Sequence, residues 1–272
     1  MKLDVFEIIS VGNELLNGKV LNTNAYWLAK MITKLGGFVR CCTVVRDDVD
    51  DISSAIKESM KRKVNWLIVS GGLGPTYDDK TLQGIAKALN RELIMNVDAL
   101  KMVEKKYEMM TYHGIIKKAD LTQARMKMAK LPKGSNPLPN PIGTAPGVMI
   151  NKGYIKIICL PGVPVEMKAI FKESIVPLIK KAINNFYYEK SIHTTGIVES
   201  DLAPLIEKVL LNNPLVYIKS YPKGYEEGNA KIEIQVTAMA EEYFTAKKRV
   251  KNALEQLKSM IIEHGGIIET KC

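Results

Sequence analysis

The sequence WLIVSGGLGPTYDD, residues 66–79, joins a short apolar run to a glycine-rich loop. Every residue from Trp66 to Val69 is apolar, which is typical of a strand covered on both faces of a parallel sheet. Apolar residues at helical spacing follow this loop, at Leu82, Ile85, Ala86 and Leu89. This succession of strand, loop and helix predicts one unit of an α/β sheet.

The same alternation extends on both sides of this unit. Apolar, β-branched segments predict strands at Val5–Val11, Phe38–Val45, Val148–Asn151 and Tyr154–Leu160. Helical spacing and capping residues predict helices that begin near Asn22 or Asn24, at Asp50 or Asp51, and at Val165. One or two further helices are expected between Asp98 and Met128. This order predicts a doubly wound, mostly parallel sheet with right-handed crossovers.

The pattern changes near residue 185. Strands are expected at Ser191–Ile197, Leu215–Tyr221, Lys231–Ala238 and Gly266–Thr270, with helices at Glu199–Leu211, capped by Ser200, and at Glu242–Glu263. The order β-α-β-β-α-β is that of a ferredoxin-like α+β unit. We therefore expect a nucleotide-binding α/β domain over residues 1–184 and a small second domain over residues 185–272. Residues 131–147, which are rich in proline and glycine, are expected to form a long functional loop of the first domain.

Composition narrows the class of protein. Of the 272 residues, 46% are hydrophobic and 25% are charged, which excludes a disordered or collagen-like chain. No apolar run approaches the roughly 20 residues that span a bilayer. The cysteines form no C-x-x-C pair, so we expect reduced thiols in a cytoplasmic protein; they are Cys41, Cys42, Cys159 and Cys272.

The chain carries a formal charge of +10, which favours anionic partners. Its basic residues are scattered through helix-like segments, and aromatic residues make up only 7%. These features do not indicate nucleic-acid binding. A small anionic molecule is the partner that the sequence favours.

The glycine-rich loop has the chemistry of a phosphate site. Gly71, Gly72 and Gly74 let the backbone turn its N–H groups towards a ligand, and a helix N-terminus beyond them would attract an anion. Thr76 and Asp79 have the spacing of a capping box. A helix cap would use only one of the adjacent carboxylates, Asp78 and Asp79, so the other would be free to bind a divalent cation.

Three more polar segments each follow an expected strand. They are residues 12–18 with the Asn22-Thr23-Asn24 triplet, residues 140–147, and residues 160–167. Because ligands of open α/β sheets bind beyond the carboxyl ends of the strands, the four segments are candidates for one crevice. Simpler interpretations remain for two of these three segments. The triplet suits a helix cap, and the helix dipole alone favours Glu166 in a first helical turn.

Together these segments resemble a known family. The stretches GNELLNG with NTN, GGLGPTYDD, NPIGTAPG and PGVPVEM occur in the order found in the CinA (competence-damage-inducible protein) family, within the wider molybdopterin-binding fold family. The resemblance covers about residues 5–170 and implies a nucleotide-binding domain that hydrolyses the pyrophosphate of ADP-ribose with a divalent metal ion. A nicotinamide mononucleotide deamidase domain, present in many members, is not expected in a chain of this length.

This resemblance implies roles for individual residues. Asp78, Asp79 and Glu166 are expected to be catalytic and to hold Mg²⁺ or Co²⁺. Substrate-binding residues are expected at Gly12, Asn13, Glu14, Asn22, Asn24, Gly71, Gly72, Gly74, Thr76, Lys80, Gly143, Thr144 and Gly162. Asn13 stands where the family usually has Asp, which puts its role in metal or ribose binding in doubt.

Two other functions stay open on the sequence. One is adenylylation of molybdopterin or a related step of molybdenum-cofactor synthesis, because the same loop and carboxylates would serve it. The other is a non-catalytic nucleotide-binding module. The family resemblance also implies self-association, and we expect a homodimer, with a homotrimer as the alternative.

Overall fold

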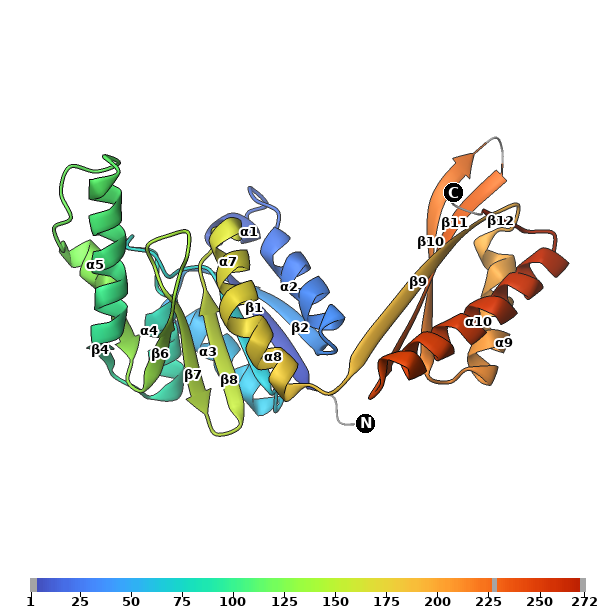
Figure 1. Ribbon diagram of the computed structural model, residues 1–272, viewed down its shortest axis with the longest axis horizontal. Helices are drawn as coiled ribbons and strands as arrows, with labels where there is room; N and C mark the ends of the chain where they lie inside the picture. Colours follow the sequence, from blue (N-terminus) through green and yellow to red (C-terminus); the bar gives the residue numbers. More distant parts are fainter. Residues whose placement is uncertain (1–3, 227–228, 270–272) are drawn as a thin grey trace. The chain divides into compact units, whose positions relative to one another are not determined.

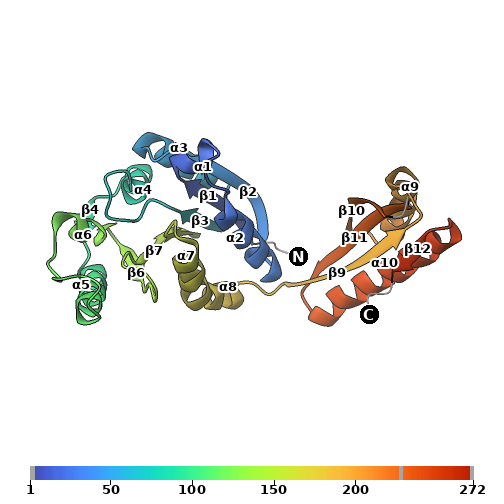
Figure 2. The same ribbon diagram turned by 90° about the horizontal axis from the view of Figure 1, so that it is seen from above.

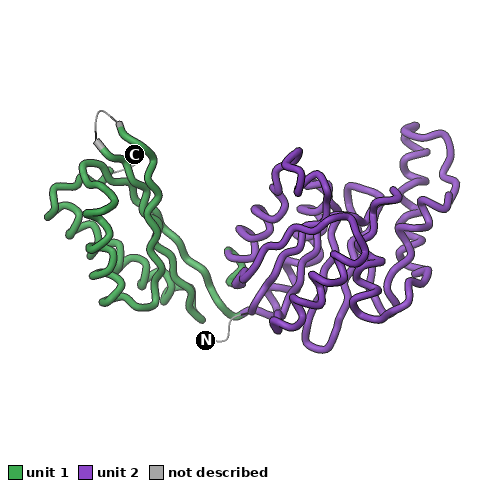
Figure 3. Tube along the Cα trace, turned by 180° about the vertical axis from the view of Figure 1, so that it is seen from behind, with its two compact units in different colours: residues 1–2, 34–36, 184–272 green, residues 3–33, 37–183 purple. Residues whose placement is uncertain are grey.

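The computed structural model describes residues 4–226 and 229–269. The chain divides into two compact units (Figure 3). The first contains most of the described residues up to Ile183, and the second contains those from Asn184 onward together with Lys34–Gly36. Within the described ranges, no helix is long and apolar enough to cross a membrane.

The first unit is built on a six-stranded sheet, in the order β2-β1-β3-β8-β7-β6 (Figure 1). The four parallel strands are β1 (Val5–Val11), β2 (Phe38–Val45), β3 (Trp66–Ser70) and β8 (Ile155–Leu160). Two antiparallel strands follow at one edge, β7 (Gly147–Lys152) and β6 (Ser135–Leu138). The predicted α/β class with a mostly parallel sheet is therefore confirmed.

Helices cover both faces of this sheet, with α3 and α4 on one side and α2 and α7 on the other (Figure 2). Their bounds are α1 Asn13–Leu16, α2 Thr23–Lys34, α3 Val49–Lys61, α4 Thr81–Leu89, α5 Val97–Tyr112, α6 Gln123–Lys127, α7 Pro164–Ile170 and α8 Val176–Ala182. All five residues of β3 are buried, as a strand between two helical layers requires. A π-helical segment, Phe171–Ile175, joins α7 to α8, so the predicted single helix contains a local irregularity.

Two details of the first unit differ from the prediction. The side chain of Asp48, and not that of Asp50 or Asp51, caps α3 by accepting hydrogen bonds from the backbone N–H groups of the two later residues. The region expected to be one long loop also contains strand structure, because β5 (Lys130–Pro132) pairs with β4 (Leu93–Met95) and β6 joins the main sheet. The loop is therefore confined to residues 139–146.

The second unit has a four-stranded antiparallel sheet in the order β10-β11-β9-β12. Its elements are β9 Phe186–Thr195, α9 Glu199–Asn212, β10 Val216–Glu226, β11 Asn229–Ala240, α10 Tyr243–Glu263 and β12 Ile267–Glu269. Their sequence is the predicted β-α-β-β-α-β. Ser200 lies inside α9 and does not cap it, because the N-cap residue is Val198. The predicted end of the last strand at Thr270, and Cys272, lie outside the described residues.

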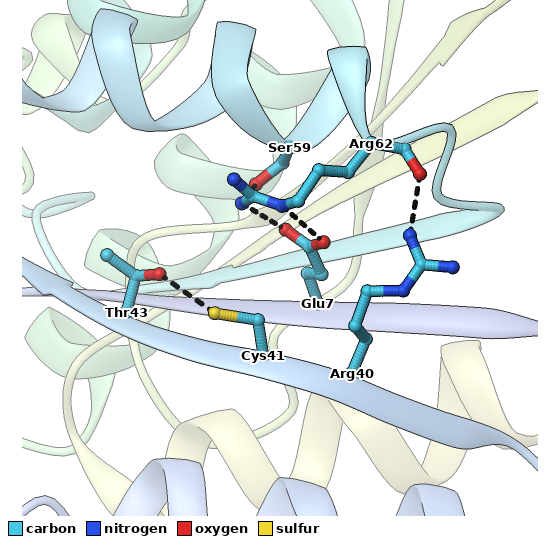
Figure 4. Close-up of polar contacts among 6 residues, drawn as sticks. All are labelled: Glu7, Arg40, Cys41, Thr43, Ser59 and Arg62. Atoms are coloured by element: carbon cyan, nitrogen blue, oxygen red, sulfur yellow. Dashed lines mark hydrogen bonds and ion pairs between the residues drawn. The ribbon is translucent and has the colours of Figure 1, made fainter.

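A partly buried ion pair joins the C-terminal end of α3 to the sheet of the first unit (Figure 4). The carboxylate of Glu7, on β1, accepts hydrogen bonds from Arg62 Nε at 2.8 Å and Nη2 at 2.6 Å. Burial alone would raise the pKa of Glu7, but the hydrogen bonds of Arg62 and Ser59 and the charges of Arg62 and Arg40 lower it. Glu7 is therefore ionised although it is only 1% exposed.

Candidate functional site

The loops that follow β1, β3 and β8 enclose a cavity of about 370 Å³ at the carboxyl ends of these strands. We call it the phosphate cavity. It is lined by Val11, Gly12, Glu14, Asp47, residues 71–76, Asp78, Asp79, Thr144, Ala145, residues 161–163 and Glu166. All four segments singled out in the sequence contribute to it. The structure therefore brings together side chains more than 150 residues apart, as an open α/β sheet does at its ligand crevice.

The glycine loop lies across the ends of β1 and β8. Gly71 has a φ of +111°, and its N–H donates to the carbonyl of Leu160 at 3.0 Å. A Cβ at this position would lie 2.2 Å from the carbonyl oxygen of Val11, so a side chain does not fit. The N–H groups of the next three residues, Gly72 to Gly74, form no hydrogen bond within the described ranges. These residues line the phosphate cavity and also a smaller pocket on the side of Lys127. They are available as donors to an anion.

Asp78 and Asp79 brace this loop through Thr76. The Thr76 N–H donates to Asp79 Oδ2 at 2.8 Å, and the Thr76 hydroxyl lies 2.6 Å from Asp78 Oδ1 and 2.5 Å from Asp79 Oδ2. The interpretation of either carboxylate as a helix cap was wrong, because α4 begins later, at Thr81. The hydrogen bond from Thr76 is the main reason that the pKa of Asp78 is lowered, so this group is ionised at neutral pH.

Glu166 is held by more than the dipole of α7. The side-chain amide of Asn140 donates to Glu166 Oε2 at 2.7 Å. The oxygen of the same amide accepts from the N–H groups of Ile142 at 3.1 Å and Gly143 at 2.8 Å, which fixes the loop. A Cβ on Gly143 would lie 1.9 Å from Glu166 Oε2, so this glycine makes room for the carboxylate. The loop over residues 139–146 thus positions Glu166 in the phosphate cavity.

Asn22 and Asn24 line a small neighbouring pocket of about 100 Å³ that shares Glu14 with the phosphate cavity. Asn22 also caps α2, since its Oδ1 accepts from the N–H of Ala25 at 3.1 Å. The Asn24 amide nitrogen donates to Ser70 Oγ at 3.1 Å and to the Gly162 carbonyl at 2.8 Å. Its oxygen is buried without a hydrogen-bond partner in the described part of the chain, so it can accept a bond from a ligand.

Asn13, Lys80 and Gly143 were expected at the site, but none of them lines the phosphate cavity. The side chain of Asn13 is exposed, and its backbone N–H donates to Asp47 Oδ2 at 2.7 Å. Asp47 itself lines the cavity and was missed, although its place two residues after the end of β2 could have revealed it. Lys127 was missed too; it donates to the Thr76 carbonyl, and burial lowers the pKa of its ammonium group. Nothing in the sequence links Lys127 to a loop about 50 residues away.

The phosphate cavity is acidic. Carboxylates enter it from Glu14, Asp47, Asp78, Asp79 and Glu166, and none of its described lining residues is Lys or Arg. No group of three or more Asp, Glu, His or Cys side chains in the described ranges is arranged to hold a metal ion alone. Oxygen donors in this pattern fit Mg²⁺, which binds to one or two carboxylates and takes its other ligands from phosphate and water.

Residues 7–181 match the family model described as a probable molybdopterin binding domain. The chain belongs to this family. A protein of Caldivirga maquilingensis is 44% identical over 253 residues, which cover 93% of this chain and 95% of that protein. A protein of Metallosphaera sedula is 41% identical over 263 residues, covering 97% and 96% of the two chains.

A solved structure shows the same relationship for about two thirds of the chain. The structure of CinA from Thermoplasma acidophilum, a protein described as having unknown function, is 42% identical to this chain. It superposes with a TM-score of 0.59 over 65% of this chain and 98% of that one. The resemblance to the CinA family within the molybdopterin-binding fold is therefore confirmed.

Proposed function

We propose that this protein hydrolyses the pyrophosphate bond of a nucleoside diphosphate conjugate, such as ADP-ribose, with the help of a divalent cation. The observation that carries the proposal is the mixed character of the phosphate cavity, which combines unpaired backbone N–H groups with carboxylates. The N–H groups attract phosphate oxygens, whereas the carboxylates repel them. A diphosphate therefore needs a cation between itself and the carboxylates.

Each part of the cavity has a role in this chemistry. The N–H groups of Gly72 to Gly74 bind phosphate oxygens, and the Thr144 hydroxyl adds a donor on the other wall. Asp78 and Asp79 would hold Mg²⁺ or Co²⁺, and phosphate oxygens and water would complete the ligands of the ion, because no third carboxylate of the described residues is grouped with this pair. A bound divalent ion supplies charge neutralisation and lowers the pKa of water.

Glu166 is also placed to orient and deprotonate the attacking water, because Asn140 fixes its orientation. The water oxygen forms a bond to one phosphorus while the bond from that phosphorus to the bridging oxygen breaks. The bridging oxygen leaves with the other phosphate. From ADP-ribose the products are AMP and ribose 5-phosphate.

A second candidate function follows from the family itself. The matching model describes a probable molybdopterin binding domain, which favours transfer of an adenylyl group to molybdopterin or its removal. The same N–H groups and carboxylates would serve that reaction, since it also takes place at a phosphate.

One experiment separates these candidates. The purified chain is incubated with ADP-ribose, FAD or adenylylated molybdopterin, with Mg²⁺, with Co²⁺, or with a chelator, and AMP is measured by chromatography. We expect metal-dependent release of AMP from ADP-ribose. Release from adenylylated molybdopterin alone would favour the second function, and binding without turnover would indicate a non-catalytic module.

A further inference from the structure

A second cavity of about 320 Å³ lies beside the phosphate cavity, between α5 and the loop over residues 139–146. We call it the α5 cavity. Met102 and Met109 line it from the helix. They are seven residues apart and therefore lie on the same face of α5. Pro139, Pro141 and Pro146 line it from the loop. Its walls are thus mainly proline rings and flexible thioether side chains.

The two cavities adjoin each other at two residues. Thr144 lines both of them. Asn140 lines the α5 cavity, and its side-chain amide donates to Glu166 Oε2 of the phosphate cavity at 2.7 Å. A molecule whose phosphates lie on the glycine loop would reach the α5 cavity by passing Thr144.

Charge and polarity indicate what this extension is. Lys105 and Lys106 flank the apolar walls, and Lys106 Nζ is fixed by a 2.7 Å hydrogen bond to the Pro141 carbonyl. Lysine ammonium groups and methionine sulfur atoms both make favourable contacts with aromatic rings. The pocket around Asn24 mixes hydroxyl, amide and carboxylate groups with aliphatic side chains, but its volume is only about 100 Å³, so the α5 cavity of about 320 Å³ has more room for a ring.

We propose that the α5 cavity binds the planar heteroaromatic ring of the nucleotide half of the substrate. This assignment rests on the function proposed for the phosphate cavity. It divides the ligand between two surfaces, with the diphosphate on the glycine loop and the ring between α5 and the proline-rich loop. The ring then contributes binding energy at a distance from the bond that breaks.

The direct test uses methionine methyl groups as reporters. The full chain, labelled with ¹³C at the methionine methyls, is titrated with α,β-methylene-ADP and Mg²⁺, and separately with methylenediphosphonate and Mg²⁺. The first probe has an adenine ring and a bridge that water does not cleave, and the second has the bridge alone. The signals are assigned with Met102→Leu and Met109→Leu.

We expect the ring to shift the Met102 and Met109 signals upfield with the first probe and not with the second. The signal of Met260, which lies in the second unit, should move with neither. Ring shifts confined to other methionines, or no ring shifts while the first probe binds, would overturn the assignment and leave the proposed function intact. Failure of both probes to bind with Mg²⁺ would overturn both proposals.

A variant measures the same contact by affinity. Met109 is 46% exposed, so Met109→Ala should not disturb folding. By calorimetry, this change should weaken the binding of α,β-methylene-ADP by about two- to tenfold, the range expected for a lost thioether–aromatic contact, and leave the binding of methylenediphosphonate unchanged. Glu108→Ala, at an exposed position of the same helix outside the cavity, is the matched control and should affect neither probe. Equal weakening of both probes by Met109→Ala would contradict a ring site.

Discussion

Replacing Arg62 with alanine should destabilise the first unit by leaving the buried Glu7 carboxylate without its partner. Glu7 is 1% exposed, and Arg62 gives it two short hydrogen bonds, at 2.8 and 2.6 Å. Removing one member of a buried ion pair costs about 3–5 kcal/mol. The Arg62 side chain is 39% exposed, so water can enter the space that it leaves. We therefore expect a loss of about 3 kcal/mol at pH 7, the lower end of that range.

The pH dependence of this loss gives a second check. In the parent protein the pKa of Glu7 is lowered, so the pair contributes stability above about pH 4.3, the usual glutamate value, and loses it as the pH falls. In Arg62→Ala, burial dominates and raises the pKa of Glu7 above that value. The unpaired carboxylate then destabilises the variant more as the pH rises. The difference in unfolding free energy between variant and parent should consequently shrink between pH 7 and pH 5.

Tryptophan fluorescence during urea unfolding measures this difference in the intact chain. Both tryptophans, Trp27 and Trp66, lie in the first unit, so the signal follows that unit alone. Lys61→Ala is the matched control, because its ion pair with Glu58 is exposed and such pairs contribute about 0–1 kcal/mol. A loss below about 1 kcal/mol for Arg62→Ala, or one equal at both pH values, would refute the reasoning.

Three further outcomes are expected. Gly143→Ala should lower the rate of diphosphate hydrolysis at saturating metal at least about tenfold, because the new Cβ would lie 1.9 Å from Glu166 Oε2 and displace that carboxylate. An unchanged rate would contradict a catalytic role of Glu166. The Cys159 thiol is buried, which raises its pKa, so iodoacetamide at pH 7 should modify it only after unfolding, as peptide mass spectrometry would show. Light scattering at micromolar concentration should give the mass of a homodimer, and a monomer mass would contradict self-association.

Local patterns predicted most of the fold because each element carries its own signal. The strand that begins at Trp66 and the amphipathic helices were predicted correctly, because the apolar positions in their sequences are the buried positions in the structure. The strand at Ser135–Leu138 was missed, since the prolines in and around it suggest a loop. Asp48 was missed as a cap because three acidic residues near the start of α3 offer equivalent signals.

The candidate site was predicted as a set of segments, and its details depended on tertiary structure. The carboxyl ends of parallel strands necessarily meet, so the convergence of the glycine loop with Glu166 followed from topology. The start of α4 at Thr81 could not be predicted from topology. The Thr81 hydroxyl donates to the Gly71 carbonyl at 2.7 Å, and the carboxylates of Asp78 and Asp79 accept hydrogen bonds from the loop instead of capping the helix. Lys127 reaches the site through a contact that no sequence spacing encodes.

The central claim is that the carboxylates of the glycine loop hold a cation on a diphosphate, and the double variant Asp78→Asn/Asp79→Asn tests it most directly. Asparagine keeps an oxygen that accepts the hydrogen bonds of Thr76, so the tryptophan-detected unfolding midpoint should stay close to that of the parent. The rate of AMP release from ADP-ribose at saturating Mg²⁺ should fall by about 100-fold or more. Full activity of the double variant under these conditions would contradict the account.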